Sequence, residues 1–268
     1  APDPSDVKEA AALLAGADHP VIYAGQGIHY AKAWKELKEL AEQWNIPVTT
    51  SIEGKSAFPE DHPLSLGSGG RANSRPVKRY LEESDLILGL GVSFALTAFG
   101  VPMPPGKKII HATLDPMDLN KDVPADIGLI GDAKLTLAAL NSELSNADNS
   151  KAAARANEPE KINELKEEWM QEWLPKLTNN EAPINPYRVV AELNQLVDKE
   201  KVVITHDAGS PRDQITPFWE STAPLSYIGW GKTTQLGYGL GLAMGAKLAE
   251  PEKPVSYTHL RAHETGYN

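Results

Sequence analysis

The chain of 268 residues contains no cysteine and no long apolar run. The lack of cysteine excludes disulfides and sites in which thiolates hold a metal. Because a membrane-spanning helix needs about 20 consecutive apolar residues, we expect no such helix. The first residues also lack the basic stretch followed by an apolar one that is typical of a signal peptide. These absences predict a cytoplasmic protein without a membrane partner.

Positive charge is scarce, because 26 Lys and Arg stand against 36 Asp and Glu, which gives a formal net charge of -10. Such a surface repels the phosphate backbone of nucleic acids, so we expect small-molecule partners and no nucleic acid. Apolar residues nevertheless make up 41% of the chain. That share is enough for a buried core, so wholesale disorder is not expected.

Short apolar runs alternate with helical patterns over the first half of the chain. Trp34, Leu37 and Trp44 have helical spacing, with Lys and Glu between them. The segment 54–75 is rich in Gly, Ser and Pro and predicts a long loop. Strands that alternate with helices predict an α/β fold, a doubly wound parallel sheet of the Rossmann-like kind. We expect its strands at 20–24, 46–50, 86–90, 108–112 and 127–130.

The alternation stops after the first half and later restarts. We expect a middle, nucleotide-binding-like domain over residues 1–145 and a linker with one amphipathic helix over residues 146–182. Residues 183–255 predict a partial second α/β domain, because strand and helix patterns return there. The segment 256–268 does not continue this pattern and is expected to be a non-native tail.

Glycines follow several of the expected strands, where ligands of open α/β sheets bind. Backbone N–H groups at such glycines can approach a phosphate, but glycines also serve tight turns and close packing, and both interpretations stay open. The full dinucleotide fingerprint fails, because Tyr30 stands where the third glycine would be. The candidate nucleotide-binding residues are Gly25, Gly27, Gly67, Gly69, Arg71, Gly91, Ser93 and Asp115.

His206-Asp207 and a pair of histidines near the end of the chain are the remaining chemical candidates. A hydrolase lacks support, because no Gly-x-Ser-x-Gly elbow exists and neighbouring residues of a strand point to opposite faces. His259 and His263 have the i, i+4 spacing of a metal pair, but no acidic residue completes a His-Glu-x-x-His pattern. We therefore assign no catalytic and no metal-binding residue.

Several motifs, taken in order, resemble the middle domain of acetolactate synthases, a family of thiamine-diphosphate-dependent enzymes. They are Pro20–Gly27, Ile46–Thr50, Ala57–Gly67, Lys108–His111, Asp115-Pro116, Val123–Asp126 and Gly131-Asp132. In that family this domain binds FAD or ADP in some members and nothing in others. Where the family's synthases carry an Arg-Phe-Asp-like run, this chain has Val92-Ser93-Phe94-Ala95. That departure argues against FAD.

Residues 183–255 are similar to the start of the family's thiamine-diphosphate-binding domain. The similar segments are Ile184–Val190, Asp207–Ser210 and Gly237–Leu248. The resemblance implies thiamine diphosphate as cofactor, with Leu236 bending it into its reactive shape. It implies cofactor-binding roles for Asp207, Gly209, Ser210, Leu236 and Gly237.

The family continues after the strand at Pro254-Val255 with Gly-Asp-Gly and a later Asn, which hold Mg²⁺ on the diphosphate. Here Ser256–Asn268 follows, and it resembles a translated cloning adaptor. We therefore expect a truncated fragment of a carboligase or decarboxylase that is itself inactive, and a homo-oligomer through its exposed second half. The alternatives are a stand-alone nucleotide-binding or structural α/β module and, more remotely, a hydrolase without a known motif.

Overall fold

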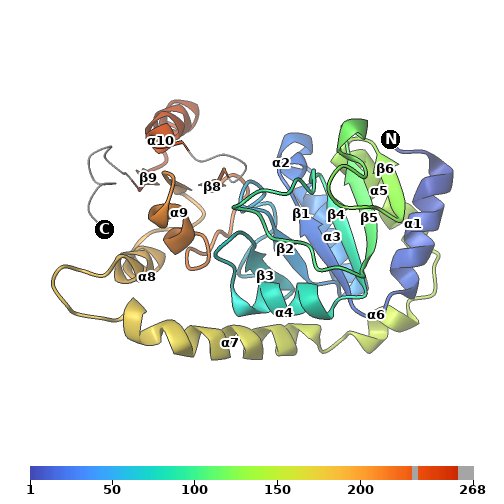
Figure 1. Cartoon of the computed structure of the whole chain (residues 1–268), viewed down its shortest axis with the longest axis horizontal. Helices are drawn as coiled ribbons and strands as arrows, with labels where there is room; N and C mark the ends of the chain where they lie inside the picture. The colour runs from blue at the N-terminus through green and yellow to red at the C-terminus, as the bar shows by residue number, and fades with distance from the viewer. Residues whose placement is uncertain (231–234, 259–268) are drawn as a thin grey trace.

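The computed structural model describes residues 1–230 and 235–258 (Figure 1). A larger first part is built on a six-stranded sheet, and a smaller second part on a three-stranded sheet. The strands of the first part are β1 (Pro20–Ala24), β2 (Val48–Thr50), β3 (Ser65–Ser68), β4 (Leu86–Leu90), β5 (Lys108–Thr113) and β6 (Ile127–Ile130). Its helices are α1 (Pro4–Gly16), α2 (Gly27–Ala31), α3 (Trp34–Trp44), α4 (Arg75–Glu83) and α5 (Ala133–Leu144), with the 3-10 turn η1 at Pro116–Asp118.

All neighbouring strands of the large sheet are parallel, in the order β3-β2-β1-β4-β5-β6. The order reverses direction at β1, as in doubly wound folds, and places a crevice at the carboxyl ends of β1 and β4. β1 and β4 lie in the centre and are buried along their whole length. Their continuous apolar sequences follow from burial on both faces of the sheet. The expected doubly wound α/β fold is confirmed.

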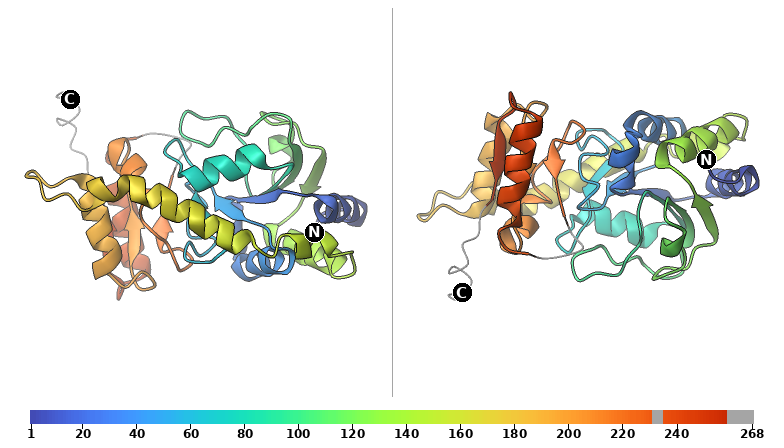
Figure 2. Two further views of the ribbon diagram at one scale, coloured as in Figure 1. Left: turned by 90° about the horizontal axis from the view of Figure 1, so that it is seen from below. Right: turned by 90° about the horizontal axis from the view of Figure 1, so that it is seen from above.

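Helices cover both faces of this sheet (Figure 2). α5 packs against both α1 and α3 on one side, and α4 lies on the other. The sequence of α3 explains how a helix packs on the sheet. One face of α3 is a buried apolar stripe of Leu37, Leu40, Ala41 and Trp44, while Lys and Glu occupy the solvent face. Caps fix the helix starts, since Asp132 accepts hydrogen bonds from two backbone N–H groups of the first turn of α5.

The expected long loop at 54–75 is wrong in one respect, because it contains β3. This strand reads Ser65-Leu66-Gly67-Ser68 and has little of the apolar character typical of a strand. Side-chain hydrogen bonds support it instead: Thr49 Oγ1 donates to Gly67 O at 2.8 Å, and Thr50 Oγ1 lies 2.9 Å from Ser68 Oγ. Because these hydrogen bonds between β2 and β3 involve polar side chains, the pattern of apolar residues did not predict β3.

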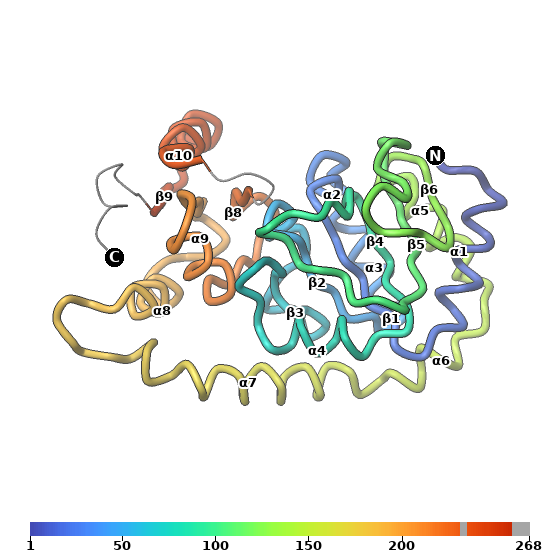
Figure 3. The backbone as a smooth tube through the Cα atoms, viewed as in Figure 1, coloured from blue at the N-terminus to red at the C-terminus, as the bar shows by residue number. Residues whose placement is uncertain are grey.

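Two helices connect the parts: α6 (Ser150–Ala154) and α7 (Glu158–Leu177). Arg155, between them, is buried, and its guanidinium donates to Ala17 O at 2.9 Å and Trp44 O at 2.8 Å. It thereby fixes the connection to the ends of α1 and α3. α7 packs against α4 and continues into the second part, where Trp169 stacks on Phe218 at 5.0 Å. The tube in Figure 3 shows this passage along α7.

The second part contains α8 (Pro186–Leu196), β7 (Val203–Thr205), α9 (Ser210–Ile215), β8 (Tyr227–Ile228), α10 (Tyr238–Ala249) and β9 (Val255–Tyr257). Its sheet is parallel, in the order β8-β7-β9. A separate core surrounds Trp219, Ile204 and Tyr227. β9 includes Ser256 and Tyr257, so the strand continues into the expected tail; the remaining tail residues, 259–268, lie outside the described residues together with His259 and His263.

Candidate functional site

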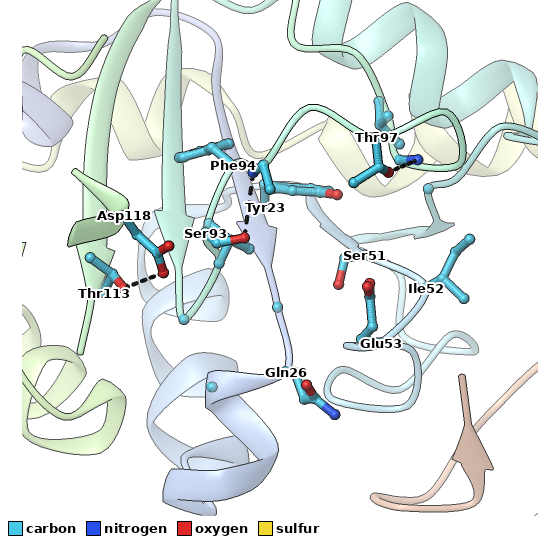
Figure 4. A pocket seen from close by; sticks show the side chains of 18 of the residues that line it. Tyr23, Gln26, Ser51, Ile52, Glu53, Ser93, Phe94, Thr97, Thr113 and Asp118 are labelled. Atoms are coloured by element: carbon cyan, nitrogen blue, oxygen red, sulfur yellow. Dashed lines mark hydrogen bonds between the residues drawn. The ribbon is translucent and has the colours of Figure 1, made fainter. Parts of the chain in front are cut away.

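A cavity of about 440 Å³ opens at the carboxyl edge of the large sheet (Figure 4). It lies beyond the ends of β1, β2, β4 and β5, and its volume is within the range of small-molecule sites. Tyr23, Ser51, Glu53, Phe94 and Asp118 come from different strand ends and loops around this space. The position agrees with the rule that open α/β sheets bind ligands where the strand order reverses.

Six of the eight candidate nucleotide-binding residues line this cavity: Gly25, Gly27, Gly69, Gly91, Ser93 and Asp115. The other two lie elsewhere. Gly67 sits within β3, paired with Thr49. Arg71 is exposed, and its backbone N–H donates to Phe99 O at 2.9 Å. The structure therefore brings most of the predicted residues together, but it leaves out the arginine expected to face a phosphate.

Close packing explains the glycines at the ends of β1 and β4. Gly27 N donates to Gly91 O at 3.0 Å, and a Cβ on Gly27 would lie 2.6 Å from Gly91 Cα. A Cβ on Gly25 would lie 2.4 Å from Gly91 O. Two turns thus touch backbone to backbone at the floor of the cavity. The N–H of Gly27 is used in this contact and is not free for a phosphate.

The side chains around the cavity carry negative charge. Glu53, Asp115 and Asp118 line it, and the described lining residues include no Lys or Arg. Thr113 Oγ1 donates to Asp118 at 3.5 Å, and Asp115 accepts from Met117 N at 2.9 Å, at the start of η1. Carboxylates suit the hydroxyl groups of a ribose better than they suit a phosphate. The described lining residues therefore offer acceptors for hydroxyl groups rather than cations for a phosphate.

The sequence motifs missed two contributors to the cavity. One is the segment from Phe94 to Met103, where Phe94 stacks on Tyr23 at 5.9 Å between ring centroids. The other is Gly229 and Trp230 from the second part. A Cβ on Gly229 would lie 2.2 Å from Ile52 O, so the two parts meet closely at this wall. No local sequence pattern predicts a contact between residues so far apart in the chain.

A second group of candidate residues lies at the end of β7 and the start of α10. Gly209 has φ +80°, Ser210 is exposed, and Leu236 is 45% exposed. Gly237 has φ +85° and its N–H meets the carboxylate of Asp207 at 3.0 Å from each oxygen. The two loops that carry the predicted cofactor residues therefore lie side by side. Asp207 itself is fully buried.

His206, beside Asp207, is a buried neutral ring rather than a base in contact with solvent. Burial lowers the pKa of His206 to about 4, and the hydrogen bond that Nδ1 makes with Asp207 O only partly opposes this. Its ring stacks on Trp230 at 5.7 Å with an interplanar angle of 9°. Desolvation of this kind disfavours the charged form of an imidazole.

A buried ion pair joins the two parts between the cavity and the second sheet. Lys55 is 1% exposed and its ammonium pairs with Glu60. Glu60 also accepts from Ser221 N at 2.8 Å, while its own N–H donates to Ser221 O at 2.9 Å. Lys166 of α7 donates to Glu60 O at 3.2 Å. Glu60 thus connects the first part, α7 and the second part.

Within residues 1–230 and 235–258, no group of three or more His, Cys, Asp or Glu side chains is placed to hold a metal ion. In the same ranges, no helix combines the length and the apolar character needed to span a membrane.

Both parts of the chain match models of known protein families. Residues 7–140 match the family model of the thiamine pyrophosphate enzyme central domain, and residues 207–258 match that of the C-terminal TPP binding domain. A probable acetolactate synthase large subunit of Methanococcus aeolicus is 32% identical over 264 residues, which is 94% of this chain and 43% of the relative. That of Methanocaldococcus jannaschii is 34% identical over 92% of this chain and 42% of the relative. An acetolactate synthase of Mycobacterium bovis is 29% identical over 95% and 41%. The chain thus spans well under half the length of these relatives.

Proposed function

The chain belongs to the thiamine pyrophosphate enzyme family, and we propose that it supplies the central domain and part of the cofactor domain of an acetolactate synthase-like carboligase or decarboxylase. The similarity of the whole chain to acetolactate synthase large subunits supports this proposal. Bound thiamine diphosphate would supply the electron sink for chemistry at a carbon next to a carbonyl.

Within the second part, we assign the diphosphate to the paired loops at the end of β7 and the start of α10. The single observation that carries this assignment is the contact of Gly237 with Asp207, because it brings the two loops of the matched cofactor domain together. Gly209 and Ser210 are accessible there, and Leu236 is half-exposed beside them. These residues fit the task of orienting the cofactor. Among the described residues, no group of three or more His, Cys, Asp or Glu side chains is placed to hold Mg²⁺, and no step is assigned to the metal.

Thiamine diphosphate with Mg²⁺ should raise the melting temperature of this chain without supporting turnover of pyruvate. Ligand at ten times its Kd adds about 1.4 kcal/mol to the free energy of unfolding. Turnover is not expected, because no Gly-Asp-Gly follows Val255 in this chain and an uncompensated diphosphate is costly to desolvate. Differential scanning fluorimetry and a pyruvate decarboxylation assay test this. No shift at millimolar cofactor would contradict binding, and Mg²⁺-dependent turnover would contradict inactivity.

The cavity supports a second proposal, that the first part binds ADP or, less readily, FAD. Its position at the sheet edge and its volume support a nucleotide, and Asp115 is placed for a ribose hydroxyl. Asp115→Ala should weaken ADP binding about tenfold, the scale of one hydrogen bond to a charged group. Arg71→Ala should leave the Kd unchanged, because Arg71 does not line the cavity. Isothermal titration calorimetry measures the Kd of each variant and of the wild type. Equal Kd values for the three proteins would reject the site. Absence of binding by the wild type would favour a structural module.

We also propose that the chain associates with itself through α10. Leu240, Met244 and Leu248 of α10 recur every fourth residue and are 44–81% exposed. An exposed apolar stripe of this kind tends to be covered by another protein surface, here that of a second copy of the chain. Light scattering at rising concentration should show a dimer or larger species, and Leu240→Glu should return the chain to a monomer. A monodisperse wild-type monomer at high concentration would contradict the proposal.

A further inference from the structure

The carboxylate of Asp207 is buried and accepts hydrogen bonds from two backbone N–H groups. Asp207 is 0% exposed. Its Oδ1 accepts from Ala208 N at 2.7 Å, and both oxygens lie 3.0 Å from Gly237 N. The carboxylate therefore joins two loops separated by 30 positions in the chain. A side chain used in this way has no oxygen turned toward a ligand in solvent.

The backbone around Asp207 is fixed from several directions. Trp230 Nε1 donates to His206 O at 3.1 Å, and Asp207 N donates to Thr258 Oγ1 at 3.2 Å. Gly239, in the first turn of α10, lies so close that a Cβ there would be 2.8 Å from His206 O. The end of β7 and the start of α10 are thus in direct contact. With the backbone held in this way, the carboxylate of Asp207 can turn outward only by losing its hydrogen bonds from Ala208 N and Gly237 N.

Electrostatics explains why a carboxylate holds this position. Gly237 is the N-cap of α10, a helix of 12 residues, and the N-terminus of a helix attracts negative charge. A hydrogen bond from N–H to a charged carboxylate is roughly twice as strong as one between neutral groups. A diphosphate in direct contact with the same carboxylate would instead meet a like charge. Placing Asp207 behind the loops lets it organise an anion site without facing the anion.

We infer that Asp207 is a positioning residue, which sets the geometry of both cofactor loops through Gly237 and does not itself touch the cofactor. This inference rests on the proposed thiamine diphosphate site for its functional consequence. It differs from the direct cofactor-binding role that the resemblance implied for Asp207. Gly209, Ser210 and Leu236 remain the residues that face the ligand.

The amide of Gly237 gives a test that needs no cofactor. In a ¹⁵N-labelled chain, the wild-type Gly237 amide should exchange slowly with deuterium, although it follows the half-exposed Leu236. Asp207→Asn keeps the size of the side chain but removes the charge, so exchange should be at least tenfold faster and the amide proton should move upfield. Rapid exchange at Gly237 in the wild type would overturn the inference whether or not the variant folds.

A matched control separates positioning from general stability. Thr205→Val removes a part-buried hydrogen bond, from Thr205 Oγ1 to Ile228 O at 2.8 Å, at the end of β7 and two residues before Asp207. Among the described residues, the Thr205 hydroxyl makes no hydrogen bond to residues 235–237. Titrations with thiamine diphosphate and Mg²⁺ should give a Kd at least tenfold weaker for Asp207→Asn and within twofold of wild type for Thr205→Val. A weaker Kd in Asp207→Asn with an unchanged Gly237 amide would mean direct contact and overturn the inference. If the wild type binds no cofactor, the proposed function fails for this chain, and the Gly237 amide alone decides the inference.

Discussion

Glu60→Ala should lower the free energy of unfolding by about 3–5 kcal/mol, the usual cost of removing one partner from a buried ion pair. Lys55 would be left buried without its carboxylate, and burial already lowers the pKa of Lys55 against the opposing effect of Glu60. The variant also leaves Ser221 N, which donates to Glu60 at 2.8 Å, without a partner. Urea unfolding monitored by tryptophan fluorescence measures the loss.

An exposed pair provides the control. Arg79 and Glu83 of α4 lie 2.9 Å apart, with side chains 56% and 63% exposed. Glu83→Ala should therefore cost no more than about 1 kcal/mol. The double variant Lys55→Met with Glu60→Gln should recover much of the loss of Glu60→Ala, since the uncompensated charge is gone and a side-chain oxygen can still accept from Ser221 N. Equal losses in Glu60→Ala and Glu83→Ala would show that the ion pair does not join the two parts.

Burial on both faces made the large sheet predictable from sequence. β1, β4 and β6 begin and end where the apolar runs do, and α3 contains the residues Trp34, Leu37 and Trp44 whose spacing indicated a helix. Core strands and amphipathic helices follow patterns that reside within a few consecutive residues. β3 escaped detection because Ser65–Ser68 is stabilised by polar contacts with β2 rather than by apolar side chains of its own.

The cavity was predictable in position but only partly in composition. Glycines after β1 and β4 indicated the correct edge, because strand ends of a parallel sheet meet there. Their cause differed from a phosphate cradle, since Gly27 and Gly91 touch one another. Arg71 was assigned to the cavity by its glycine-rich neighbours, yet it lies outside, and Trp230 reaches the cavity from the second part. Contacts between distant segments depend on how the two parts dock, and no local sequence pattern predicts that docking.

The same distinction applies to the cofactor loops. The resemblance located Asp207 and Gly237 in the two loops, but it treated both as residues facing the ligand. The structure adds that Gly237 N lies 3.0 Å from both carboxylate oxygens of Asp207, from which we infer that Asp207 acts through Gly237. A sequence shows which residue types are present at a site; only their burial and hydrogen bonds show which of them remain free to bind.

Gly91→Ala should destabilise the chain far more than Gly106→Ala, although both glycines have left-handed backbone angles. Their φ values are +61° and +77°, so alanine meets a similar conformational cost of about 1–2 kcal/mol at either position. The surroundings differ. A Cβ on Gly106 meets nothing within 4 Å, whereas one on Gly91 would lie 2.7 Å from Gly27 Cα and 3.0 Å from Ile28 N.

Backbone atoms cannot move aside as the end of a flexible side chain can, so the turns after β1 and β4 must separate in Gly91→Ala. The hydrogen bond from Gly27 N to Gly91 O would lengthen with them. Overpacking of this kind typically costs about 1–3 kcal/mol, in addition to the conformational cost shared with Gly106→Ala. Urea midpoints of the two variants give the difference directly. Because Gly25, Gly27 and Gly91 line the cavity, Gly91→Ala should also weaken any nucleotide bound there, while Gly106→Ala should not. Equal midpoints would mean that the two turns are not in tight contact.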